Sequence, residues 1–371
     1  MDILRAKTCD LKQTRPLDER RKQNSSLNEQ EAKLYEEVLK SYPRRLVFEL
    51  TNACNLNCVM CGRNSATFKP TFFNKEWVNT FEPVIDSIEE VTLMGWGEPT
   101  VHPDFTFFLN WAYKSGLRKY FCTNGMRLDN IFKDIFDTET DIIAISLDGA
   151  DKETNDKIRR GADFNKITSA LRTIVNEKRR NNTDFPYINF VFTAMKSNFR
   201  QIPDMVRLAS DIGLDELKVV YLTAFERSLQ EDTLYDCMSE VKDVFDEAAV
   251  VAEELSIALK LPHIVGNDPA GDKCHKDCYT PWRDFFLGSD GYVRSCMSTP
   301  DKLFQINKYN NFDLMWNSPE YTSLRRVINT ENMPLACRNC YQSSFANWNK
   351  YSSFIQTGQN FAPQWEKSRS N

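Results

Sequence analysis

The sequence has little histidine, no long apolar run and no excess of positive charge. Its three histidines, His102, His263 and His275, are too scattered to form a site, and we expect each to be structural. No apolar stretch approaches the roughly 20 residues of a membrane-spanning helix, and the N-terminal segment lacks the apolar core of a signal peptide. A formal net charge of −5 gives no positive field for a nucleic acid. We therefore expect a cytoplasmic protein with no membrane or nucleic-acid partner.

Cysteine, by contrast, is abundant, with 11 residues in a chain of 371. In a reducing compartment, thiols are more often metal ligands or catalytic groups than disulfides. The length allows two domains with a sizeable core. We interpret at least seven of the cysteines as metal ligands, in two groups that are well separated along the chain.

The first group lies in residues 51–63, which read TNACNLNCVMCGR. Cys54, Cys58 and Cys61 have the spacing C-x3-C-x2-C. Three thiolates can ligate three irons of a cubic [4Fe-4S] cluster and leave the fourth iron open to a small molecule. A structural zinc site usually has four ligands and is built from cysteine pairs. Zinc binding or simple burial of the thiols is therefore the less favoured alternative.

Short apolar runs alternate with amphipathic stretches after residue 45, which predicts β-α units and a parallel sheet. The six expected strands are 46–50, 91–94, 119–122, 142–147, 188–192 and 217–222. The expected helices lie around residues 77–88, 105–112, 167–174, 205–212 and 238–255, with Gly116 and Gly213 ending two of them. Pro83 predicts a kink or an earlier end in the first of these helices.

The N-terminal segment is polar, and we expect residues 1–25 to be a loosely ordered arm. A helix is predicted over residues 28–41, with Asn28 as N-cap and Glu31 three residues on. Its apolar stripe would consist of Leu34, Tyr35, Val38 and Leu39. We expect this helix to cover one end of the following domain, because a single short helix is marginal alone.

Polar motifs follow four neighbouring strands at the point where each strand ends. The cysteine motif follows the first strand, residues 95–99 (GWGEP) the second and residues 123–125 (TNG) the third, while residues 146–149 (SLDG) close the fourth. In parallel α/β folds, ligands bind at the carboxyl ends of the strands. These four motifs are therefore expected to form one active site.

The C-x3-C-x2-C motif just after a strand resembles that of the radical S-adenosylmethionine (SAM) superfamily, and the six β-α units resemble its partial barrel over residues 45–260. The resemblance implies that the open iron binds the amino and carboxylate groups of SAM. It also implies that an electron from the cluster splits SAM into methionine and a deoxyadenosyl radical. We expect an α/β fold, a partial (β/α)6 TIM-like barrel, preceded by a polar arm and covering helix (1–44) and followed by a smaller cysteine-rich module (261–371).

The resemblance also implies which residues contact SAM. Gly95, Gly97 and Glu98 match a GGEP motif that meets the SAM amino group, although Trp96 replaces the usual second glycine and its side chain is unexplained. Asn124 belongs to the third motif and is a further candidate.

Ser146 and Arg159 match positions that contact the SAM carboxylate and ribose, although Arg160 stands beside Arg159. Met60 occupies the position where relatives often place an aromatic side chain against adenine. For residues 219–222, packing in the core and lining the adenine pocket are equally favoured.

The second cysteine group consists of Cys278, Cys296, Cys337 and Cys340, and the β-α alternation stops before it. Four thiolates can close a zinc site or a fully ligated iron-sulfur cluster, so the residues leave the metal open. The pattern resembles the auxiliary-cluster domain called SPASM, or its shortened form, Twitch. Because no cysteine follows Cys340, the resemblance implies one auxiliary [4Fe-4S] cluster. Cys274 is a possible extra ligand or a substrate-facing thiol.

The expected enzyme is a radical SAM oxidoreductase that abstracts hydrogen from a substrate C–H bond. We favour dehydrogenation or epimerisation of a small, polar, sugar-like or aminocyclitol-like metabolite, because the arm before residue 45 looks too short for a peptide-recognition domain. A peptide-modifying maturase is the alternative, and an iron-sulfur or zinc binding protein is the non-enzymatic one. The expected electron donor is a flavodoxin or a ferredoxin.

An epimerase would need a thiol that returns hydrogen to the opposite face of the substrate. Cys237 and Cys274 are the candidates. For both of these, as for Cys9 and Cys122, an ordinary buried or surface thiol is nevertheless the favoured interpretation.

Overall fold

A computed structural model of the chain describes residues 15–337, apart from 66–68, 225–226, 235, 263, 265–276, 297–298, 300 and 335–336. Cys9, Cys274 and Cys340 lie outside the described residues, as do His263 and His275. The predictions made for these five residues are therefore left as they stand.

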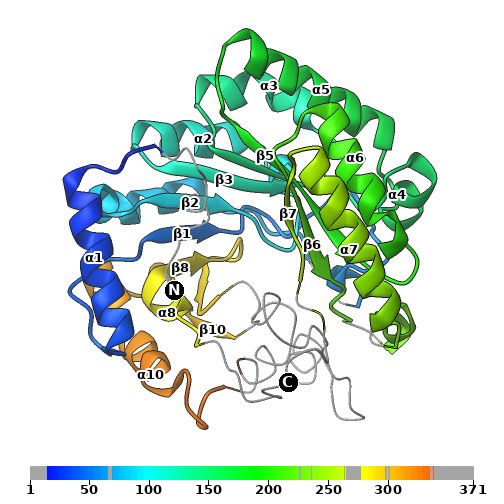
Figure 1. Cartoon of the computed structure of the whole chain (residues 1–371). Helices are drawn as coiled ribbons and strands as arrows, with labels where there is room; N and C mark the ends of the chain where they lie inside the picture. Colours follow the sequence, from blue (N-terminus) through cyan, green and yellow to red (C-terminus); the bar gives the residue numbers. More distant parts are fainter. Residues whose placement is uncertain are drawn as a thin grey trace.

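The fold is built on one sheet with the strand order β10-β9-β8-β1-β2-β3-β4-β5-β6-β7 (Figure 1). From β8 to β7 all neighbouring strands are parallel, while β9 and β10 are antiparallel. The sheet does not close, since β7 and β10 are its edges, so the expected partial TIM-like barrel is confirmed. The strands are β1 (Arg45–Phe48), β2 (Glu90–Leu93), β3 (Arg118–Thr123), β4 (Ile142–Ser146), β5 (Tyr187–Ala194), β6 (Glu216–Tyr221), β7 (Ala258–Lys260), β8 (Asp284–Leu287), β9 (Tyr292–Arg294) and β10 (Lys302–Gln305).

Two parallel strands extend the six-stranded set that the sequence predicts. β7 pairs with β6 and is only three residues long, too short to give an apolar run. β8 pairs with β1, although it lies in the cysteine-rich part of the chain. The module after residue 260 is thus joined to the barrel by a continuous hydrogen-bonded sheet. The domain boundaries at residues 44 and 260 stay predictions.

Helices cover the outer face of the sheet, and the apolar core lies between the two layers (Figure 1). All five helices expected between the strands are present, although Lys75–Ser87 forms a 3-10 helix that contains Pro83. The main helices are α1 (Glu19–Lys33), η3 (Lys75–Ser87), α2 (Phe105–Lys114), α3 (Leu128–Asp137), α4 (Lys152–Ile158), α5 (Phe164–Arg180), α6 (Ile202–Ile212), α7 (Met238–Glu254), α8 (Thr280–Arg283), α9 (Phe312–Trp316) and α10 (Pro319–Val327).

Glycine ends two helices as the sequence predicts. Gly116 and Gly213 have positive φ angles of 67° and 90°, the left-handed conformation that glycine adopts without steric cost. The Gly213 N–H donates to the carbonyl of Ala209 at 3.0 Å and so completes the last turn of α6. These turns send the chain back toward the sheet after each crossover.

The first helix, α1, begins nine residues before the predicted position, so the prediction that Asn28 is the N-cap is wrong. The N-cap is Asp18, whose carboxylate accepts the Arg21 N–H at 2.9 Å. Leu34 and Val38 of the predicted apolar stripe lie beyond the helix and are 71% and 65% exposed. Apolar spacing misplaced the helix because its buried face is polar.

Hydrogen bonds dock this polar face of α1 on the barrel. Asn28 is fully buried, and its Nδ2 donates to Ser41 Oγ at 2.9 Å and to the Trp282 carbonyl at 2.8 Å. Arg21 Nε donates to the Ile88 carbonyl at 2.7 Å. Because buried polar groups are costly unless they are paired, these contacts fix one position for the helix.

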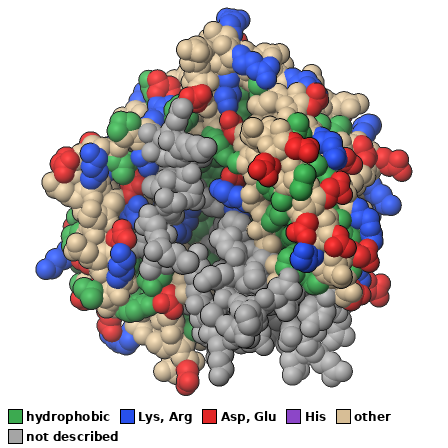
Figure 2. Space-filling view, in the orientation of Figure 1, with side chains coloured by type: hydrophobic (Ala, Val, Ile, Leu, Met, Phe, Trp, Pro, Cys, Tyr) green, Lys and Arg blue, Asp and Glu red, His purple; other side chains and the backbone are tan. Residues whose placement is uncertain are grey.

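The surface carries charges of both signs, interspersed over the face shown in Figure 2. In the part of the chain that the structure describes, no helix is long and apolar enough to cross a membrane.

Asn28→Ala should lower the free energy of unfolding by about 1–3 kcal/mol, because the substitution leaves the Trp282 carbonyl and the Ser41 hydroxyl without their buried donor. Gln23→Ala is the control, since Gln23 lies on the exposed face of the same helix. Its effect should stay within about 0.5 kcal/mol. Urea denaturation measures both, and equal effects of the two substitutions would contradict the docking role of Asn28.

Candidate active site

The cysteine loop follows β1 and carries Cys54, Cys58 and Cys61, whose side chains are all partly exposed. The Cys61 N–H donates to the Cys58 carbonyl at 3.1 Å, which tightens the second half of the loop. The Leu56 N–H points to Cys54 Sγ at 3.4 Å. The chain thus folds locally so that all three thiols lie on one short segment.

The end of α4 supports the outer side of this loop. The Asn57 N–H donates to the Arg160 carbonyl and the Val59 N–H to the Ile158 carbonyl, both at 2.9 Å. Gly161, with a φ of 94°, lets the chain turn beside the buried Leu56 side chain. Backbone hydrogen bonds therefore hold the loop against the end of α4.

The turn after β2 packs against the beginning of the cysteine loop. A Cβ atom at Gly97 would overlap the backbone oxygens of Thr51 and Ala53, so only glycine fits there. The next residue, Glu98, donates its N–H to the Ala53 carbonyl at 2.9 Å. The sequence predicts that Gly97 lets the backbone approach a ligand, and in the structure it lets two segments of the chain approach each other.

Glu98 is buried, and its carboxylate accepts hydrogen bonds from two neighbouring segments. Oε1 accepts from Thr100 Oγ1 at 2.6 Å and from Thr123 Oγ1 at 2.7 Å, while Oε2 accepts the Asn124 N–H at 2.7 Å. Burial raises the pKa of this carboxyl, and these donors oppose the shift. The Glu98 side chain therefore joins the ends of β2 and β3, which leaves the turn's backbone carbonyls as the candidate partners for an ammonium group.

Asn124 lies beside the first cysteine. Its Nδ2 donates to Asn55 Oδ1 at 2.9 Å and lies 3.9 Å from Cys54 Sγ. Its own Oδ1 accepts the Met126 N–H at 3.0 Å, which fixes the amide orientation. The third motif is thus brought to the cysteine loop, as the common edge of a parallel sheet requires.

The SLDG motif at the end of β4 holds an ion pair. Arg159 Nε lies 2.7 Å from Asp148 Oδ2, and both side chains are buried. Asp148 Oδ1 also accepts the Thr193 N–H at 2.7 Å. Burial raises the pKa of the Asp148 carboxyl, and the Arg159 guanidinium opposes this shift. Arg160 is exposed, so of the two arginines Arg159 is the one that points inward.

Ser146 and Met60 make separate contacts, one at the end of β4 and one in the cysteine loop. Ser146 Oγ lies 3.5 Å from Cys122 Sγ, at the end of β3. Met60 packs against a small apolar cluster that is separate from the main core and consists of Ile158, Met195 and Leu222. Leu222 is therefore on the side of the cysteine loop, whereas Val219 and Tyr221 belong to the main core.

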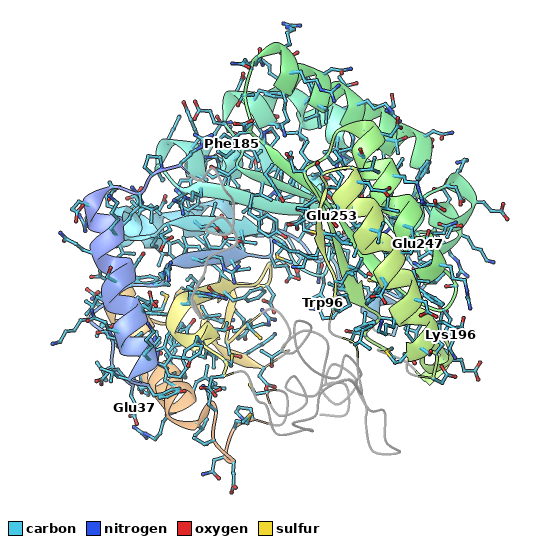
Figure 3. All side chains as sticks on the ribbon, viewed as in Figure 1. Glu37, Trp96, Phe185, Lys196, Glu247 and Glu253 are labelled. Carbon is cyan, nitrogen blue, oxygen red and sulfur yellow. The ribbon has the colours of Figure 1, made fainter. Side chains whose placement is uncertain are left out.

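Sequence reasoning missed Glu49, which directly follows the last residue of β1. The feature that could have identified it is a charged residue inside the otherwise apolar run 46–50. Its Oε1 accepts the Trp96 N–H at 2.9 Å. A Cβ atom at Gly95 would overlap the Glu49 side chain, so this glycine makes room for the carboxylate. Trp96 itself lies inside the arc of the strands, whereas Lys196 and Glu247 lie on the outer rim (Figure 3).

The three thiols suit an iron-sulfur cluster. Burial raises the pKa of Cys54, and it raises the pKa of Cys58 to about 11, with smaller contributions from the neighbouring thiols. Thiolates in such a place require cationic partners, which irons provide. In the described residues, no three His, Cys, Asp or Glu side chains are arranged to hold a single metal ion. A cubic cluster does not need such convergence, because each thiolate binds a different iron.

Three of the four cysteines in the second group are described, namely Cys278, Cys296 and Cys337, and all are partly exposed. Asn329 holds the first of them in place, accepting its N–H at 2.8 Å and donating to its carbonyl at 3.2 Å. Burial raises the pKa of the Cys278 thiol. Like those of the first group, the described cysteines of this second group are therefore partly exposed, and burial raises the pKa of at least one of their thiols.

Cys237 and His102 each lie close to the backbone carbonyl of another residue. Cys237 immediately precedes α7, packs against the core, and points its Sγ to the Leu234 carbonyl at 3.5 Å. His102 is buried, with Nε2 3.0 Å from the Phe73 carbonyl and Nδ1 accepting the Asp104 N–H at 3.0 Å. Burial lowers the pKa of this imidazole.

Comparison with known protein families supports the chemistry of both cysteine groups. Residues 48–193 match the radical SAM superfamily, and residues 278–341 match SPASM, an iron-sulfur cluster-binding domain. The chain thus contains a radical SAM domain and a SPASM domain. Its radical SAM domain binds a [4Fe-4S] cluster and SAM, and its SPASM domain binds auxiliary iron-sulfur clusters. The cofactors expected from the sequence are thereby confirmed.

Two proteins with similar sequences match different lengths of the chain. A tungsten-containing aldehyde ferredoxin oxidoreductase cofactor-modifying protein of Pyrococcus furiosus is 23% identical over 323 residues, which are 80% of this chain and 86% of the relative. The mycofactocin maturase MftC of Mycobacterium tuberculosis is 31% identical over 176 residues, 46% of this chain and 43% of the relative. The chain thus matches less than half the length of that maturase.

The fold is similar to that of SuiB from Streptococcus suis, solved with bound SAM. The TM-score is 0.63 at 16% sequence identity, covering 82% of this chain and 72% of SuiB. A structure of SuiB bound to the precursor peptide SuiA gives a TM-score of 0.61, also at 16% identity, and covers 85% of this chain and 74% of SuiB. At this identity, the likeness shows the fold alone.

Gly97→Ala should weaken SAM binding at least about tenfold and cost about 1–3 kcal/mol of stability, because the new methyl group would force the turn away from the Thr51 and Ala53 carbonyls. Gly116→Ala is a matched control. Its methyl group would meet only the Arg21 guanidinium at 3.5 Å, so the cost should be the left-handed backbone, about 1–2 kcal/mol, with SAM affinity unchanged. Calorimetric titration with SAM and urea denaturation measure these effects. Parent-like SAM affinity in Gly97→Ala would contradict the packing role.

Proposed function

We propose that this protein reductively cleaves SAM and uses the resulting radical to abstract hydrogen from a C–H bond of a substrate, with net oxidation or epimerisation as the outcome. The observation that supports this most is the convergence of three segments of the chain on the cysteine loop. Gly97, Asn124 and the end of α4 all contact the segment that carries Cys54, Cys58 and Cys61.

When bound, SAM and its cluster supply a deoxyadenosyl radical, which is reactive enough to break an unactivated C–H bond. The chain's contribution is to hold the reacting carbon beside that radical and to exclude water. We assign the three thiols as ligands and the backbone of residues 95–97 as the partner of the SAM ammonium group. Ser146 and Arg159 face the carboxylate and ribose, with Asp148 fixing the guanidinium.

Met60 and Leu222 provide an apolar surface beside the cysteine loop. Their cluster includes the buried residues Ile158 and Met195. We assign this surface to the adenine ring, because a soft thioether and branched side chains pack against a planar base. The auxiliary cluster is assigned to Cys278, Cys296, Cys337 and Cys340, and its chemistry is electron transfer.

We consider two substrate classes, and the names of the relatives change the order in which we rank them. The sequence favours a small, sugar-like or aminocyclitol-like metabolite. The names of the relatives favour a larger precursor, since one is a maturase, one is a cofactor-modifying protein, and SuiB has been solved with a precursor peptide. We therefore place a peptide or cofactor precursor first and the small polar metabolite second.

The remaining assignments concern partners. Because SAM cleavage consumes an electron, we propose a low-potential donor such as a flavodoxin or a ferredoxin, in the cytoplasm. A non-enzymatic iron-sulfur or zinc binding protein is the rival function. It would need the cysteine loop but not the Arg159–Asp148 pair or the packed turn at Gly97.

Replacing Cys54, Cys58 and Cys61 together by Ala should abolish deoxyadenosine formation and remove one of the two clusters. After anaerobic reconstitution, the variant should keep roughly four irons per chain, against roughly eight in the parent. Cys9→Ser is the control and should keep all the iron and full SAM cleavage. Liquid chromatography of deoxyadenosine and metal analysis measure the outcome. Continued SAM cleavage would contradict the proposed function, and zinc in place of the remaining iron would contradict the auxiliary cluster.

Deuterated candidate substrates from the two classes should differ in whether they transfer deuterium to deoxyadenosine. A deuterium on the reacting carbon should move into deoxyadenosine, which mass spectrometry detects, and only members of the correct class should transfer it. Product analysis then separates the two outcomes, because epimerisation returns a hydrogen to carbon and dehydrogenation does not. Transfer from small polar metabolites and not from peptides would reverse the order of substrates given above.

A further inference from the structure

Glu49 is a buried carboxylate that the proposed function does not use. Its side chain lies where β1 ends and is only 6% exposed. Phe48 and Leu50, its neighbours, pack into the core between the sheet and the helices, so Glu49 faces the inside of the barrel. Within the described residues it forms no ion pair. A buried carboxylate without a cation is costly unless its hydrogen bonds are satisfied, so its acceptors need partners.

One oxygen of Glu49 holds the SAM-binding turn. Oε1 accepts the Trp96 N–H at 2.9 Å, and the absence of a side chain at Gly95 makes this approach possible. From Trp96 the chain continues through Gly97 to Glu98, whose N–H donates to the Ala53 carbonyl. Two hydrogen bonds and the backbone between them therefore connect Glu49 to the cysteine loop through the GWGEP turn. We call this connection the first arm of the Glu49 network.

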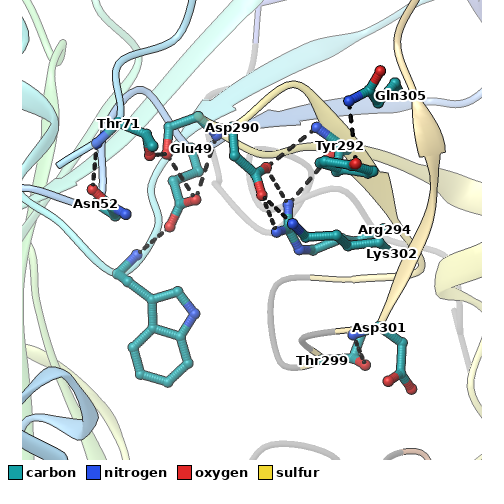
Figure 4. A network of polar contacts seen from close by, with 12 residues as sticks. Glu49, Asn52, Thr71, Asp290, Tyr292, Arg294, Thr299, Asp301, Lys302 and Gln305 are labelled. Carbon is teal, nitrogen blue, oxygen red and sulfur yellow. Dashed lines mark hydrogen bonds and ion pairs between the residues drawn. The ribbon is translucent and has the colours of Figure 1, made fainter. Parts of the chain in front are cut away.

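The other oxygen holds the SPASM domain. Oε2 accepts from the Ser289 N–H at 3.4 Å and from Ser289 Oγ at 3.2 Å (Figure 4). Ser289 lies in the turn between β8 and β9, inside the range that matches SPASM. A single carboxylate thus contacts the turn that we assign to SAM and the domain that holds the auxiliary cysteines.

A second arm leads from Ser289 back to the cysteine loop. Ser289 Oγ lies 2.7 Å from Thr71 Oγ1, and the Thr71 N–H donates to Asn52 Oδ1 at 2.8 Å (Figure 4). The Thr71 carbonyl accepts from Thr51 Oγ1 at 2.7 Å. Both arms end on residues 51–53, immediately before Cys54, so they form a closed circuit at the start of the cysteine loop.

We propose that Glu49 is a positioning residue that couples the SPASM domain to the SAM-binding turn. The carboxylate holds the two parts in one relative position, so a substrate carried by the SPASM side meets the radical at the correct carbon. This inference rests on the proposed function. Loss of Glu49 should therefore allow SAM to be cleaved without conversion of the substrate.

Another buried acid provides a matched control. Glu90 begins β2, is fully buried, and accepts Thr92 Oγ1 at 2.9 Å. Because β2 runs parallel to β1, Glu90 lies at the opposite end of the barrel from Glu49. Glu90→Gln removes a buried negative charge just as Glu49→Gln does, but far from the circuit. Any general effect of losing a buried carboxylate should appear in both variants.

The first test compares the two activities of the reconstituted enzyme. Glu49→Gln should raise the KM for SAM at least about fivefold, the scale of a weakened hydrogen bond to a charged acceptor. It should also raise the ratio of deoxyadenosine to product by a similar factor. Of the hydrogen bonds to Glu49, Ser289→Ala removes only the one that the Ser289 side chain of the SPASM domain donates. The ratio of deoxyadenosine to product should therefore rise, while the KM for SAM should change less. Glu90→Gln should leave both values at those of the parent.

The second test is independent of activity and uses amide hydrogen exchange. Ser289→Ala leaves the hydrogen bond between Trp96 and Glu49 in place. If Glu49 couples the two parts, amide exchange in residues 95–98 should nevertheless accelerate at least about threefold in this variant. Glu90→Gln should not accelerate it. Parent-like exchange in Ser289→Ala, or a parent-like product ratio in Glu49→Gln, overturns the proposal. A parent that forms no deoxyadenosine overturns the proposed function instead, and the exchange rates still decide the role of Glu49.

Discussion

The packing of the Gly97 backbone against the Thr51 and Ala53 carbonyls is the contact on which the site depends. No side chain fits between these two segments, and the Glu98 N–H closes the contact with a hydrogen bond to Ala53. The Glu98 carboxylate then ties this turn to the end of β3 through Thr123. The ends of three strands consequently form one unit, and a short loop with three thiols acquires a defined position without secondary structure of its own.

Buried negative charge is the second constraint on this region. Glu49, Glu98 and Asp148 all lie near the cysteine loop, and in the described part of the chain only Asp148 has a cationic partner among them, Arg159. Burial also raises the pKa of Cys54 and Cys58, so their thiolates are unfavourable in isolation. Such a site is matched to cationic groups, which irons and SAM both provide.

The sheet sets how the two cysteine groups are placed. β8 pairs in parallel with β1 over residues 284–287, so the chain enters the SPASM domain along the edge of the barrel. The cysteine loop leaves from the carboxyl end of β1, and the turn with Ser289 leaves from the same end of β8. Because neighbouring parallel strands are hydrogen-bonded in register, the two groups cannot shift independently at this edge.

The sequence alone determined the alternation of strands and helices, the presence of two cysteine groups and the helix ends at Gly116 and Gly213, because these features follow from local periodicity, spacing and backbone conformation. Only the tertiary structure decided where α1 begins, that β8 joins the barrel, and what Gly95 and Glu49 contact. The physical reason is distance along the chain. Glu49 and Ser289 are 240 residues apart, and no local pattern reports a hydrogen bond between them. Apolar periodicity likewise fails for α1, which docks through buried polar side chains such as Asn28.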